Sequence, residues 1–391
     1  MRVGLVIERI ETWRGGAETS TLEYAHLLAQ RGVEVSILTS SRCPSPPDLR
    51  VVPIAVGATP RPLRTVRFIR KATAVARRER LDLVHAITPM PRADLYQPRG
   101  GLMRETLARN LALRPAGAAR LLKRVAAALN VKHRALLRLE EAALQPDGPM
   151  IAAVSAYVAR QLATHYGIDG PRVRVVFNGV NVAPASAEQR RAERGAIRAE
   201  YGVRDDELLL LCVAHNFRLK GVAPLLHAVA NVVAAGGPGV RLLVAGRDNP
   251  AGMVALAQRL AVADRVMFAG PTQRIAAFYH AADVCVHPTY YDPCSRVVLE
   301  ALSRGVPCIT TRHNGAAEAM RDGVHGYVID SADDVEALAG RIRALRDTEQ
   351  RREMGRAALA LAPRLSMTRH VDEMLAVYDA CAARRPAGAR A

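Results

Sequence analysis

The stretch ADVCVHPTYYDPCSRVVLEALSRGVPCITTRHNGAAEAMRDGVHGYVID, residues 282–330, decides the fold class of this chain. It contains three short apolar runs, at 283–287, 306–310 and 326–329, and a segment with helical periodicity that begins at Ser295. Short, continuous apolar runs predict strands that are buried on both faces. Because these strands alternate with helical segments, the stretch indicates an α/β domain with a parallel sheet.

The same alternation continues over the whole chain. Further strands are expected at 2–7, 33–39, 81–86, 150–155, 208–213, 240–245 and 265–269, with helices between them. Because a chain of 391 residues exceeds what one hydrophobic core usually holds, two successive doubly wound domains are expected. Ligands of such domains bind at the carboxyl ends of the strands, so the turns that follow strands are the first places to seek chemistry.

The composition excludes several classes of protein and indicates an anionic partner. The net charge of +18 favours nucleic acid, a phosphorylated substrate or a membrane surface. The N-terminal segment MRVGLVIERI lacks the cleavage site of a signal peptide, and no apolar stretch approaches the roughly 18–20 residues of a membrane span. Six scattered cysteines without CxxC spacing predict reduced thiols in a cytosolic protein.

Two turns offer seats for an anion. In the turn WRGGAET, Gly15 and Gly16 let the backbone approach a ligand in front of a helix N-terminus. In the turn VAHNFRLKG, Arg218 and Lys220 can both reach a diphosphate. The alternatives are a purely structural glycine turn and two solvated surface cations. Neither turn matches GxGxxG or GxxxxGKS/T, so NAD and ATP chemistry are unsupported.

The junction YYDPCSRVVLEA has an acid on each side of a helix start. Ser295 is a candidate N-cap, and the amides of Arg296 and Val297 then favour a phosphate at the strand end. Glu300 can accept hydrogen bonds from the two hydroxyls of a ribose, and Asp292 can bind a sugar. The two acids would thus bracket a nucleotide-sugar. The alternative is that Glu300 makes a surface ion pair and Asp292 belongs to a turn.

These residues resemble motifs of the retaining glycosyltransferases of family 4, which have the GT-B fold. The D-x7-E pair resembles that family's E-x7-E element, RGGAE its first glycine turn, FNGVN the entry to its C-terminal domain and FRLKG its phosphate-binding loop. The resemblance implies two Rossmann-like domains that face a central cleft, an acceptor-binding domain at 1–180 and a nucleotide-sugar-binding domain at 181–363. A C-terminal helix at about 364–391 is expected to pack back on the first domain.

Within the family, the chain is most similar to lipopolysaccharide core glucosyltransferases, through NFRLKG, LLVAGRDNP and PRADLYQPRGG. This similarity implies that glucose moves from UDP-glucose to an inner-core heptose of a glycolipid or polysaccharide, with Tyr96 and Arg99 as candidate acceptor contacts. The chain departs from the family where Asp292 replaces a glutamate, Ser295 a glycine and His215 an arginine. Each departure bears on the choice of donor sugar.

The resemblance also implies retention at the anomeric carbon, without a metal or other cofactor. Lys220, Arg218 and the helix amides would stabilise the departing nucleoside diphosphate, and Asp292 would act at the sugar. The residues agree with this mechanism, since the chain has no convincing DxD motif and its histidines are too isolated for a ligand cluster.

Basic residues recur at helical spacing over residues 103–144. Because basic amphipathic helices commonly lie on anionic membranes, the segment predicts a peripheral protein at the inner face of the cytoplasmic membrane. The alternative is a helix pair that packs on the N-terminal sheet with a solvated basic face. Nucleic acid is not expected as a partner, because only 4% of the residues are aromatic and no known binding motif is present.

Three rival functions remain open. The chain could use another nucleotide-sugar donor with a lipid-linked acceptor. A sugar-nucleotide epimerase of the same fold would convert the donor without an acceptor. A non-catalytic basic protein that binds sugar-nucleotides or nucleic acid would keep only the fold.

Overall fold

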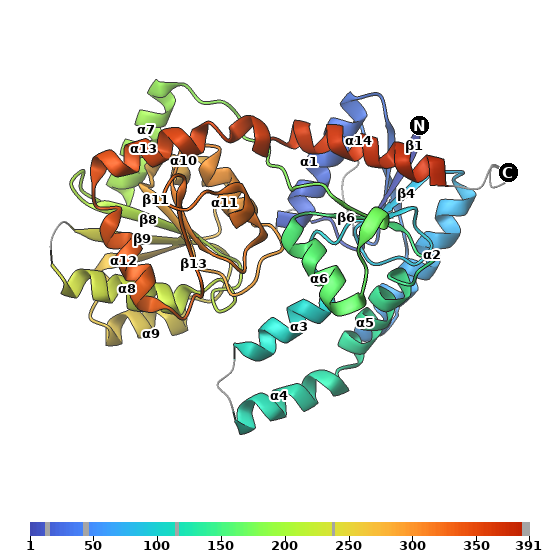
Figure 1. The fold of residues 1–391 in the computed structure, drawn as a ribbon, viewed down its shortest axis with the longest axis horizontal. Coiled ribbons are helices and arrows are strands. Elements are labelled where there is room, and N and C mark those ends of the chain that lie inside the picture. The colour runs from blue at the N-terminus through green and yellow to red at the C-terminus, as the bar shows by residue number, and fades with distance from the viewer. Residues whose placement is uncertain (12–15, 42–46, 114–116, 237–238, 385–391) are drawn as a thin grey trace. The chain divides into compact units, whose positions relative to one another are not determined.

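The computed structural model describes residues 1–11, 16–41, 47–113, 117–236 and 239–384. The chain divides into two compact units, shown as ribbons in Figure 1. Unit 1 comprises Met1–Gly179 and Met367–Ala391, and unit 2 comprises Val180–Ser366. The chain therefore leaves unit 1 once and returns to it for its last helix.

Unit 1 is built on a seven-stranded parallel sheet. Its strands are β1 (Arg2–Val6), β2 (Glu34–Thr39), β3 (Arg50–Pro53), β4 (Leu83–Ala86), β5 (Leu95–Tyr96), β6 (Met150–Ala153) and β7 (Val173–Val175). Its helices are α1 (Gly16–Gln30), α2 (Arg64–Arg78), α3 (Met103–Ala112), α4 (Ala118–Leu129), α5 (Val131–Ala143), α6 (Ala156–Tyr166) and α14 (Met367–Arg384). The strand order is β3-β2-β1-β4-β5-β6-β7, so the order reverses between β1 and β4.

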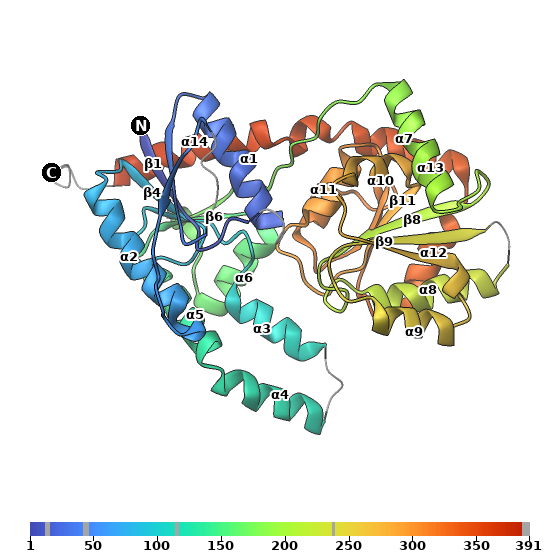
Figure 2. The same cartoon turned by 180° about the vertical axis from the view of Figure 1, so that it is seen from behind.

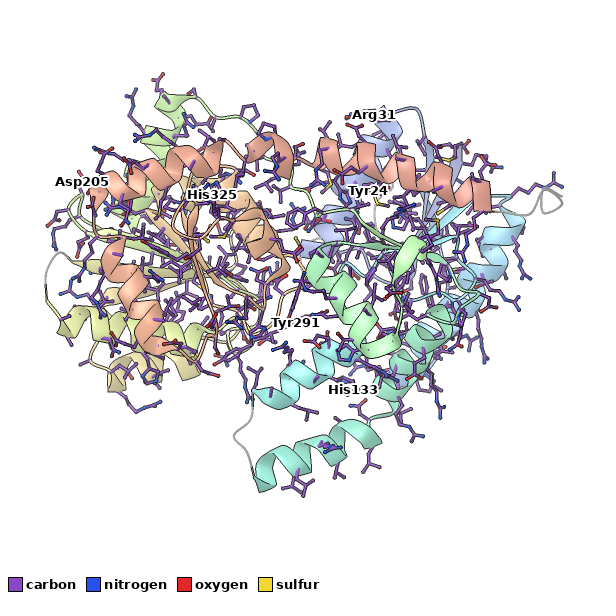
Figure 3. The ribbon with its side chains drawn as sticks, viewed as in Figure 1. Tyr24, Arg31, His133, Asp205, Tyr291 and His325 are labelled. Atoms are coloured by element: carbon purple, nitrogen blue, oxygen red, sulfur yellow. The ribbon has the colours of Figure 1, made fainter. Side chains whose placement is uncertain are left out.

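The C-terminal helix α14 packs against α1, β4 and β6 of unit 1. Buried polar side chains join these elements: the hydroxyl of Tyr24 donates to the hydroxyl of Tyr378 at 2.6 Å, and Nδ1 of His85 lies 2.8 Å from the same Tyr378 hydroxyl. Tyr24 lies inside unit 1, alongside α14 (Figure 3). Because buried hydroxyls need partners, this network favours one docked position of α14.

Unit 2 is built on a six-stranded parallel sheet. Its strands are β8 (Leu208–Val213), β9 (Val240–Ala245), β10 (Val266–Gly270), β11 (Val284–His287), β12 (Cys308–Thr311) and β13 (Gly326–Ile329). Its helices are α7 (Ala187–Glu200), α8 (Val222–Ala234), α9 (Ala251–Arg259), α10 (Ile275–Ala281), α11 (Arg296–Leu302), α12 (Val335–Ala344) and α13 (Thr348–Leu359). Helices α8, α9 and α12 cover one face of the sheet, and α10 and α11 cover the other (Figures 1 and 2).

The strand order of unit 2 is β10-β9-β8-β11-β12-β13, the order of a doubly wound dinucleotide-binding sheet. Strand β8 reads LLLLCV and is buried almost throughout, as expected for a parallel strand that is covered on both faces. The prediction of two Rossmann-like α/β domains is therefore confirmed.

The strands that the apolar pattern missed are β3, β5 and β7. Strands β3 and β7 lie at the two edges of the sheet of unit 1 and are only partly buried, so they carry charged residues instead of a continuous apolar run. Strand β5 is only two residues long. Over the part of the chain that the structure describes, no helix has both the length and the apolar character of a membrane span.

Candidate functional site

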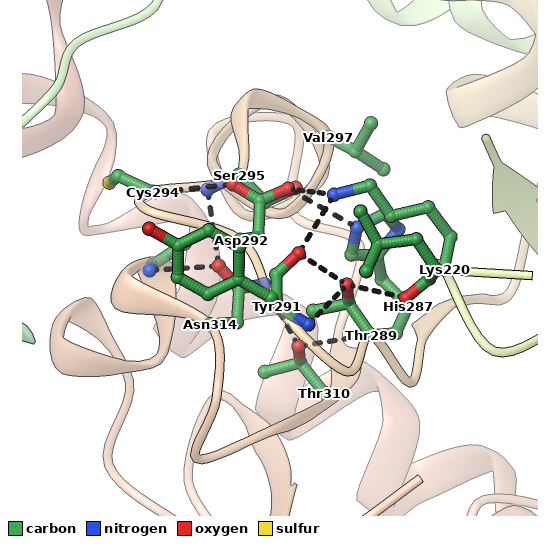
Figure 4. Close-up of polar contacts among 12 residues, drawn as sticks. Lys220, His287, Thr289, Tyr291, Asp292, Cys294, Ser295, Val297, Thr310 and Asn314 are labelled. Atoms are coloured by element: carbon green, nitrogen blue, oxygen red, sulfur yellow. Dashed lines mark hydrogen bonds and ion pairs between the residues drawn. The ribbon is translucent and has the colours of Figure 1, made fainter. Parts of the chain in front are cut away.

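The predicted donor residues of unit 2 gather at the carboxyl ends of β8 and β11 (Figure 4). Lys220 lies in the loop after β8, and Asp292 lies between β11 and α11. The strand order of the sheet reverses between these two strands. In doubly wound sheets, ligands bind at this reversal, because the loops after the two strands lead to opposite faces of the sheet.

Lys220 and Asp292 form an ion pair at the centre of this site. Nζ of Lys220 lies 2.6 Å from Oδ2 of Asp292 and donates a second hydrogen bond to the carbonyl oxygen of Tyr291 at 3.3 Å. Oδ1 of Asp292 accepts the amide of Cys294 at 3.1 Å. The sequence-based prediction assigned Lys220 to the diphosphate and Asp292 to the sugar, and it did not anticipate that the two side chains touch.

The charges of this pair are set by burial and by each other. Burial alone would raise the pKa of Asp292, but the charge of Lys220 outweighs it and, with His287 nearby, holds this pKa well below its usual value. His287 is buried with Nε2 3.7 Å from Oδ2 of Asp292, and burial lowers its pKa. The site therefore holds a carboxylate and an ammonium beside a neutral imidazole at neutral pH.

A glycine lets the loop after β8 pack against the end of β11. Gly221 has a φ of +71°, and a Cβ there would lie 2.1 Å from the carbonyl oxygen of Pro288. A side chain at this position would strain the backbone and displace the loop after β11. The amide of Tyr290 also donates to the carbonyl oxygen of Leu219 at 2.9 Å. These contacts hold the ammonium of Lys220 against its carboxylate partner.

Asn314, which follows β12, organises the start of α11 (Figure 4). Its side chain is buried, and Oδ1 accepts the amides of Ser295 at 3.1 Å and Ala316 at 3.0 Å. The prediction that the side chain of Ser295 caps α11 is wrong: Ser295 occupies the N-cap position, but within the described chain its hydroxyl makes no capping hydrogen bond. Spacing along the sequence identified the position, whereas the side chain that orders it comes from a different loop.

Asn314→Ala is expected to lower the free energy of unfolding by about 1–3 kcal/mol, because the buried amide of Ser295 loses its acceptor. Urea-induced unfolding of both proteins measures the difference. Arg312→Ala is the matched control, since its exposed side chain forms a surface ion pair with Asp330 and its removal should cost at most about 1 kcal/mol. Equal losses in the two variants would contradict the ordering role of Asn314.

Glu300 lies in the second turn of α11, and its carboxylate has two partners. Nη2 of Arg296 donates to Oε1 at 3.1 Å, and the hydroxyl of Tyr279 donates to Oε2 at 3.1 Å. Both oxygens retain lone pairs that can accept the hydroxyls of a ribose. Tyr279 is fully buried in α10, and burial, together with the charge of Glu300, raises its pKa well above the usual value. The sequence analysis missed Tyr279, because no local pattern links positions that lie 21 residues apart.

The cations near the end of β8 include one residue that the sequence analysis missed. Arg218 is exposed in the loop after β8, as predicted for a cation that meets a ligand. Arg247 follows β9, and the charges of Arg247 and Lys220 add to the burial that lowers the pKa of His215. His215 therefore lies in a positive field and supplies no charge itself. Its position directly after a predicted strand was the signal that could have identified Arg247.

The remaining predicted residues lie in unit 1. Gly16 begins α1, and Gly15 lies outside the described residues. Tyr96 and Arg99 are only 2% and 7% exposed, and Nε of Arg99 donates to Oε1 of Gln97 at 2.7 Å. The prediction that Tyr96 and Arg99 contact an acceptor is therefore corrected, because both side chains belong to the interior of unit 1.

Comparison with known proteins supplies a family for this fold and site. Residues 14–183 match the family described as Glycosyltransferase Family 4, and residues 193–360 match the family described as Glycosyl transferases group 1. The chain carries two glycosyltransferase domains. In this glycosyltransferase-type chain, the group 1 match covers the strands and loops that hold Lys220, Asp292 and Glu300.

Individual proteins differ in how much of this glycosyltransferase-type chain they match. A D-inositol 3-phosphate glycosyltransferase from Segniliparus rotundus is 34% identical over 61% of this chain, and the match spans about half of that protein (54%). WaaG, a glycosyltransferase involved in lipopolysaccharide biosynthesis, has a TM-score of 0.81 at 22% identity, with 96% of this chain and 99% of WaaG covered. Alr3699/HepE from Anabaena, solved with UDP-glucose, has a TM-score of 0.70 at 18% identity, with 96% and 100% covered. The two structures confirm the GT-B fold, and the specific likeness to lipopolysaccharide core enzymes stays a prediction.

Proposed function

We propose that this chain is a retaining glycosyltransferase that moves a hexose, glucose from UDP-glucose, to a glycolipid or polysaccharide acceptor. The observation that carries the proposal is the contact between Lys220 and Asp292 at the strand-order reversal, with Glu300 on the helix that follows. A cation suits a diphosphate, and carboxylates suit the hydroxyls of a ribose and a hexose. Since one fold serves many functions, the site and not the fold supports the donor class.

The ion pair suggests how a donor would be received. Nζ of Lys220 would exchange the carboxylate of Asp292 for the oxygens of the diphosphate, where negative charge grows as the glycosidic bond to the donor breaks. Asp292, released from its partner, would accept hydrogen bonds from the hydroxyls of the hexose. Because Asp292 is buried and ionised in the absence of the donor, it needs no proton transfer to take this role.

The acceptor is the less constrained half of the proposal. The name of WaaG supports a lipopolysaccharide acceptor such as an inner-core heptose, and the name of the Segniliparus rotundus relative supports an inositol phosphate instead. The net charge of +18 suits either acceptor, since both carry phosphate or lie beside it. We favour the glycolipid, because α4 has an apolar face that a soluble acceptor would not require.

Incubation with UDP-glucose and heptose-bearing lipopolysaccharide core is expected to release UDP over time, and EDTA should not lower the rate. The metal expectation follows because the described residues include no group of three or more His, Cys, Asp or Glu side chains that could hold a metal ion. Conversion of UDP-glucose without an acceptor would indicate an epimerase, and binding without conversion a non-catalytic protein. UDP release with inositol 3-phosphate alone would replace the proposed acceptor. Loss of activity in EDTA that Mg²⁺ restores would contradict the metal-free mechanism.

We further propose that the protein is peripheral at the inner face of the cytoplasmic membrane and docks through α4. Four large apolar side chains of this helix are exposed: Leu121 (61%), Leu122 (70%), Val125 (50%) and Leu129 (70%). Basic side chains accompany them, since Arg124 on α4 and Arg134 on α5 are exposed, and Arg120 and Lys123 share the helix. In contrast, Glu105 of α3 and Glu140 of α5 are buried, so these two helices pack within unit 1. The proposal therefore narrows from residues 103–144 to α4.

Binding to vesicles of phosphatidylglycerol and phosphatidylcholine is expected to be strong at low ionic strength and to fall as salt screens the charges. Vesicles of phosphatidylcholine alone should bind poorly. Leu122→Ser with Leu129→Ser should abolish binding, as should glutamine at Arg120, Lys123, Arg124 and Arg134, whereas Val254→Ser in unit 2 is the control for an exposed apolar residue. Equal binding to charged and neutral vesicles, or to neither, would contradict membrane docking by α4.

A further inference from the structure

Unit 2 contains a cavity of about 680 Å³ at the sheet edge opposite the donor residues. It is lined by residues at the amino ends of three strands, among them Leu208 before β8, Asp283 before β11 and Pro307 before β12, and by residues of α13. In a parallel sheet the amino and carboxyl ends of the strands lie at opposite edges. None of the residues assigned above to the donor lines this cavity, so it is a separate feature of unit 2.

Arginine dominates the lining of the cavity. The six lining arginines are Arg194, Arg304, Arg346, Arg351, Arg352 and Arg356. Three of them donate hydrogen bonds to backbone carbonyl oxygens: Arg304 to Glu300 at 3.1 Å, Arg346 to Gly236 at 2.6 Å and Arg351 to Leu345 at 2.6 Å. Among the described residues, no carboxylate lies within ion-pair distance of these three guanidinium groups. Their positive charges are therefore oriented but not neutralised.

The acidic residues of the lining are already paired. Asp283 accepts from Arg194 at 2.8 Å and Arg198 at 3.2 Å. Glu207 lies 3.4 Å from Arg204 and 3.5 Å from Arg265, and neither of these arginines lines the cavity. The fully exposed Asp205 lies at the outer edge of unit 2 (Figure 3). The acids thus leave an excess of positive charge inside the cavity.

The two remaining arginines are held only loosely. Arg352 and Arg356 on α13 lie 3.7 Å and 3.3 Å from the carboxylate of Glu349, and all three side chains are more than half exposed. Exposed pairs of this kind contribute little to stability. Both guanidinium groups can therefore turn toward a ligand at small cost.

We propose that this cavity binds a small phosphorylated anion, such as an oligophosphate or a phosphorylated metabolite. Guanidinium groups match phosphate oxygens in a bidentate geometry, and several of them around one cavity suit a ligand with more than one phosphate charge. The volume of the cavity lies within the range of about 300–1,000 Å³ that is usual for small-molecule sites. The firmly held arginines supply a fixed positive wall, and Arg352 and Arg356 close on the ligand.

Arg304 joins this cavity to the donor residues. Besides its bond to the carbonyl oxygen of Glu300, its guanidinium lies 5.1 Å from the centre of the Tyr279 ring. Tyr279 in turn donates to the carboxylate of Glu300. A phosphate that draws Arg304 into the cavity weakens both contacts, and the position of the Glu300 carboxylate then changes. Occupancy of the cavity thereby alters nucleotide affinity, a consequence that rests on the proposed ribose contact.

The test is calorimetric titration of the full chain with inorganic pyrophosphate. Two classes of site are expected, of which saturating UDP removes only the one at Lys220. Arg352→Ala with Arg356→Ala should weaken the UDP-insensitive class by about 10-fold or more, since two charge-assisted contacts are lost. Arg77→Ala with Arg78→Ala, an exposed pair on α2, is the matched control and should retain both classes. Unchanged melting temperatures of both double variants show that the effect is local.

Three outcomes overturn the proposal. These are a single class of site that UDP removes completely, an UDP-insensitive class that survives Arg352→Glu with Arg356→Glu, and loss of anionic-vesicle binding instead of pyrophosphate binding in these variants. The coupling is tested separately: saturating pyrophosphate should change UDP affinity about five-fold or more in the control pair and not in the Arg352/Arg356 pair. If UDP fails to bind at all, the donor proposal fails, whereas the pyrophosphate titration still decides the cavity.

Discussion

Lys220→Ala is expected to lower turnover by about 10²–10³-fold while the KM for the donor rises much less. Charge builds on the diphosphate as the bond to the sugar breaks, so a cation that meets the diphosphate acts mainly in the transition state. The ion pair with Asp292 places this cation at the end of β8 before the donor arrives, and no reorganisation is needed to charge it. Steady-state kinetics with varied UDP-glucose measures both parameters.

The variant has a second effect that must be separated from the first. Asp292 has a lowered pKa in the folded protein, so it contributes stability that is present above its unfolded pKa and is lost as the pH falls through the folded value. Without Lys220, burial dominates and raises this pKa, so Lys220→Ala should be less stable than the wild type at pH 7. Lys220→Ala with Asp292→Ala removes the unpaired carboxylate and should recover part of that stability without recovering turnover.

Arg218→Ala provides the comparison within the same loop. Arg218 is exposed, and its loss should also lower turnover more than it raises the donor KM, but without the stability loss expected for Lys220→Ala. Full turnover with weak donor binding in either variant would reduce that residue to a contact of the ground state. Recovery of turnover in the Lys220/Asp292 double variant would show that the loss came from the unpaired carboxylate.

The fold was predictable from the sequence wherever a strand lies inside a sheet. Strand β8 is surrounded by packed elements, so its residues are almost all apolar and the run is visible without any tertiary information. Strand β7 is an edge strand with partly exposed residues, and its sequence VRV carries no comparable signal. The spacing of the interior strands was sufficient for the fold class, because edge strands add width to a sheet without changing its topology.

The candidate site was predictable only in part, because its geometry depends on contacts between loops. Lys220 and Glu300 follow strands of a doubly wound sheet, so their general location follows from the strand pattern alone. The contact between Lys220 and Asp292 depends on how closely the loop after β8 approaches Pro288, which only the packed backbone determines. Likewise, nothing in the sequence near Ser295 indicates that Asn314 receives its amide.

Glu300→Ala is expected to weaken UDP binding by about 10–150-fold, which corresponds to about 1.5–3 kcal/mol for a lost hydrogen bond to a charged group. The carboxylate of Glu300 already accepts from Arg296 and Tyr279, and these two donors fix its rotamer with lone pairs left for a ligand. A pre-positioned carboxylate loses little side-chain entropy on binding, so most of the contact appears in the measured affinity. Calorimetric titration with UDP, without any acceptor, isolates this effect from catalysis.

Two further variants and one further ligand make the assignment specific to the ribose. Glu336→Ala removes an exposed glutamate of α12 and should leave UDP affinity unchanged, whereas Tyr279→Phe removes one donor to Glu300 and should have a smaller effect than Glu300→Ala. 2′-Deoxy-UDP should bind the wild type more weakly than UDP does, because one of the two ribose hydroxyls is missing. In Glu300→Ala this difference should vanish, since the hydroxyl and the carboxylate form one interaction and their effects are not additive. A difference between UDP and 2′-deoxy-UDP that persists in Glu300→Ala would show that another residue holds the ribose, and unchanged UDP affinity would remove Glu300 from the donor site altogether.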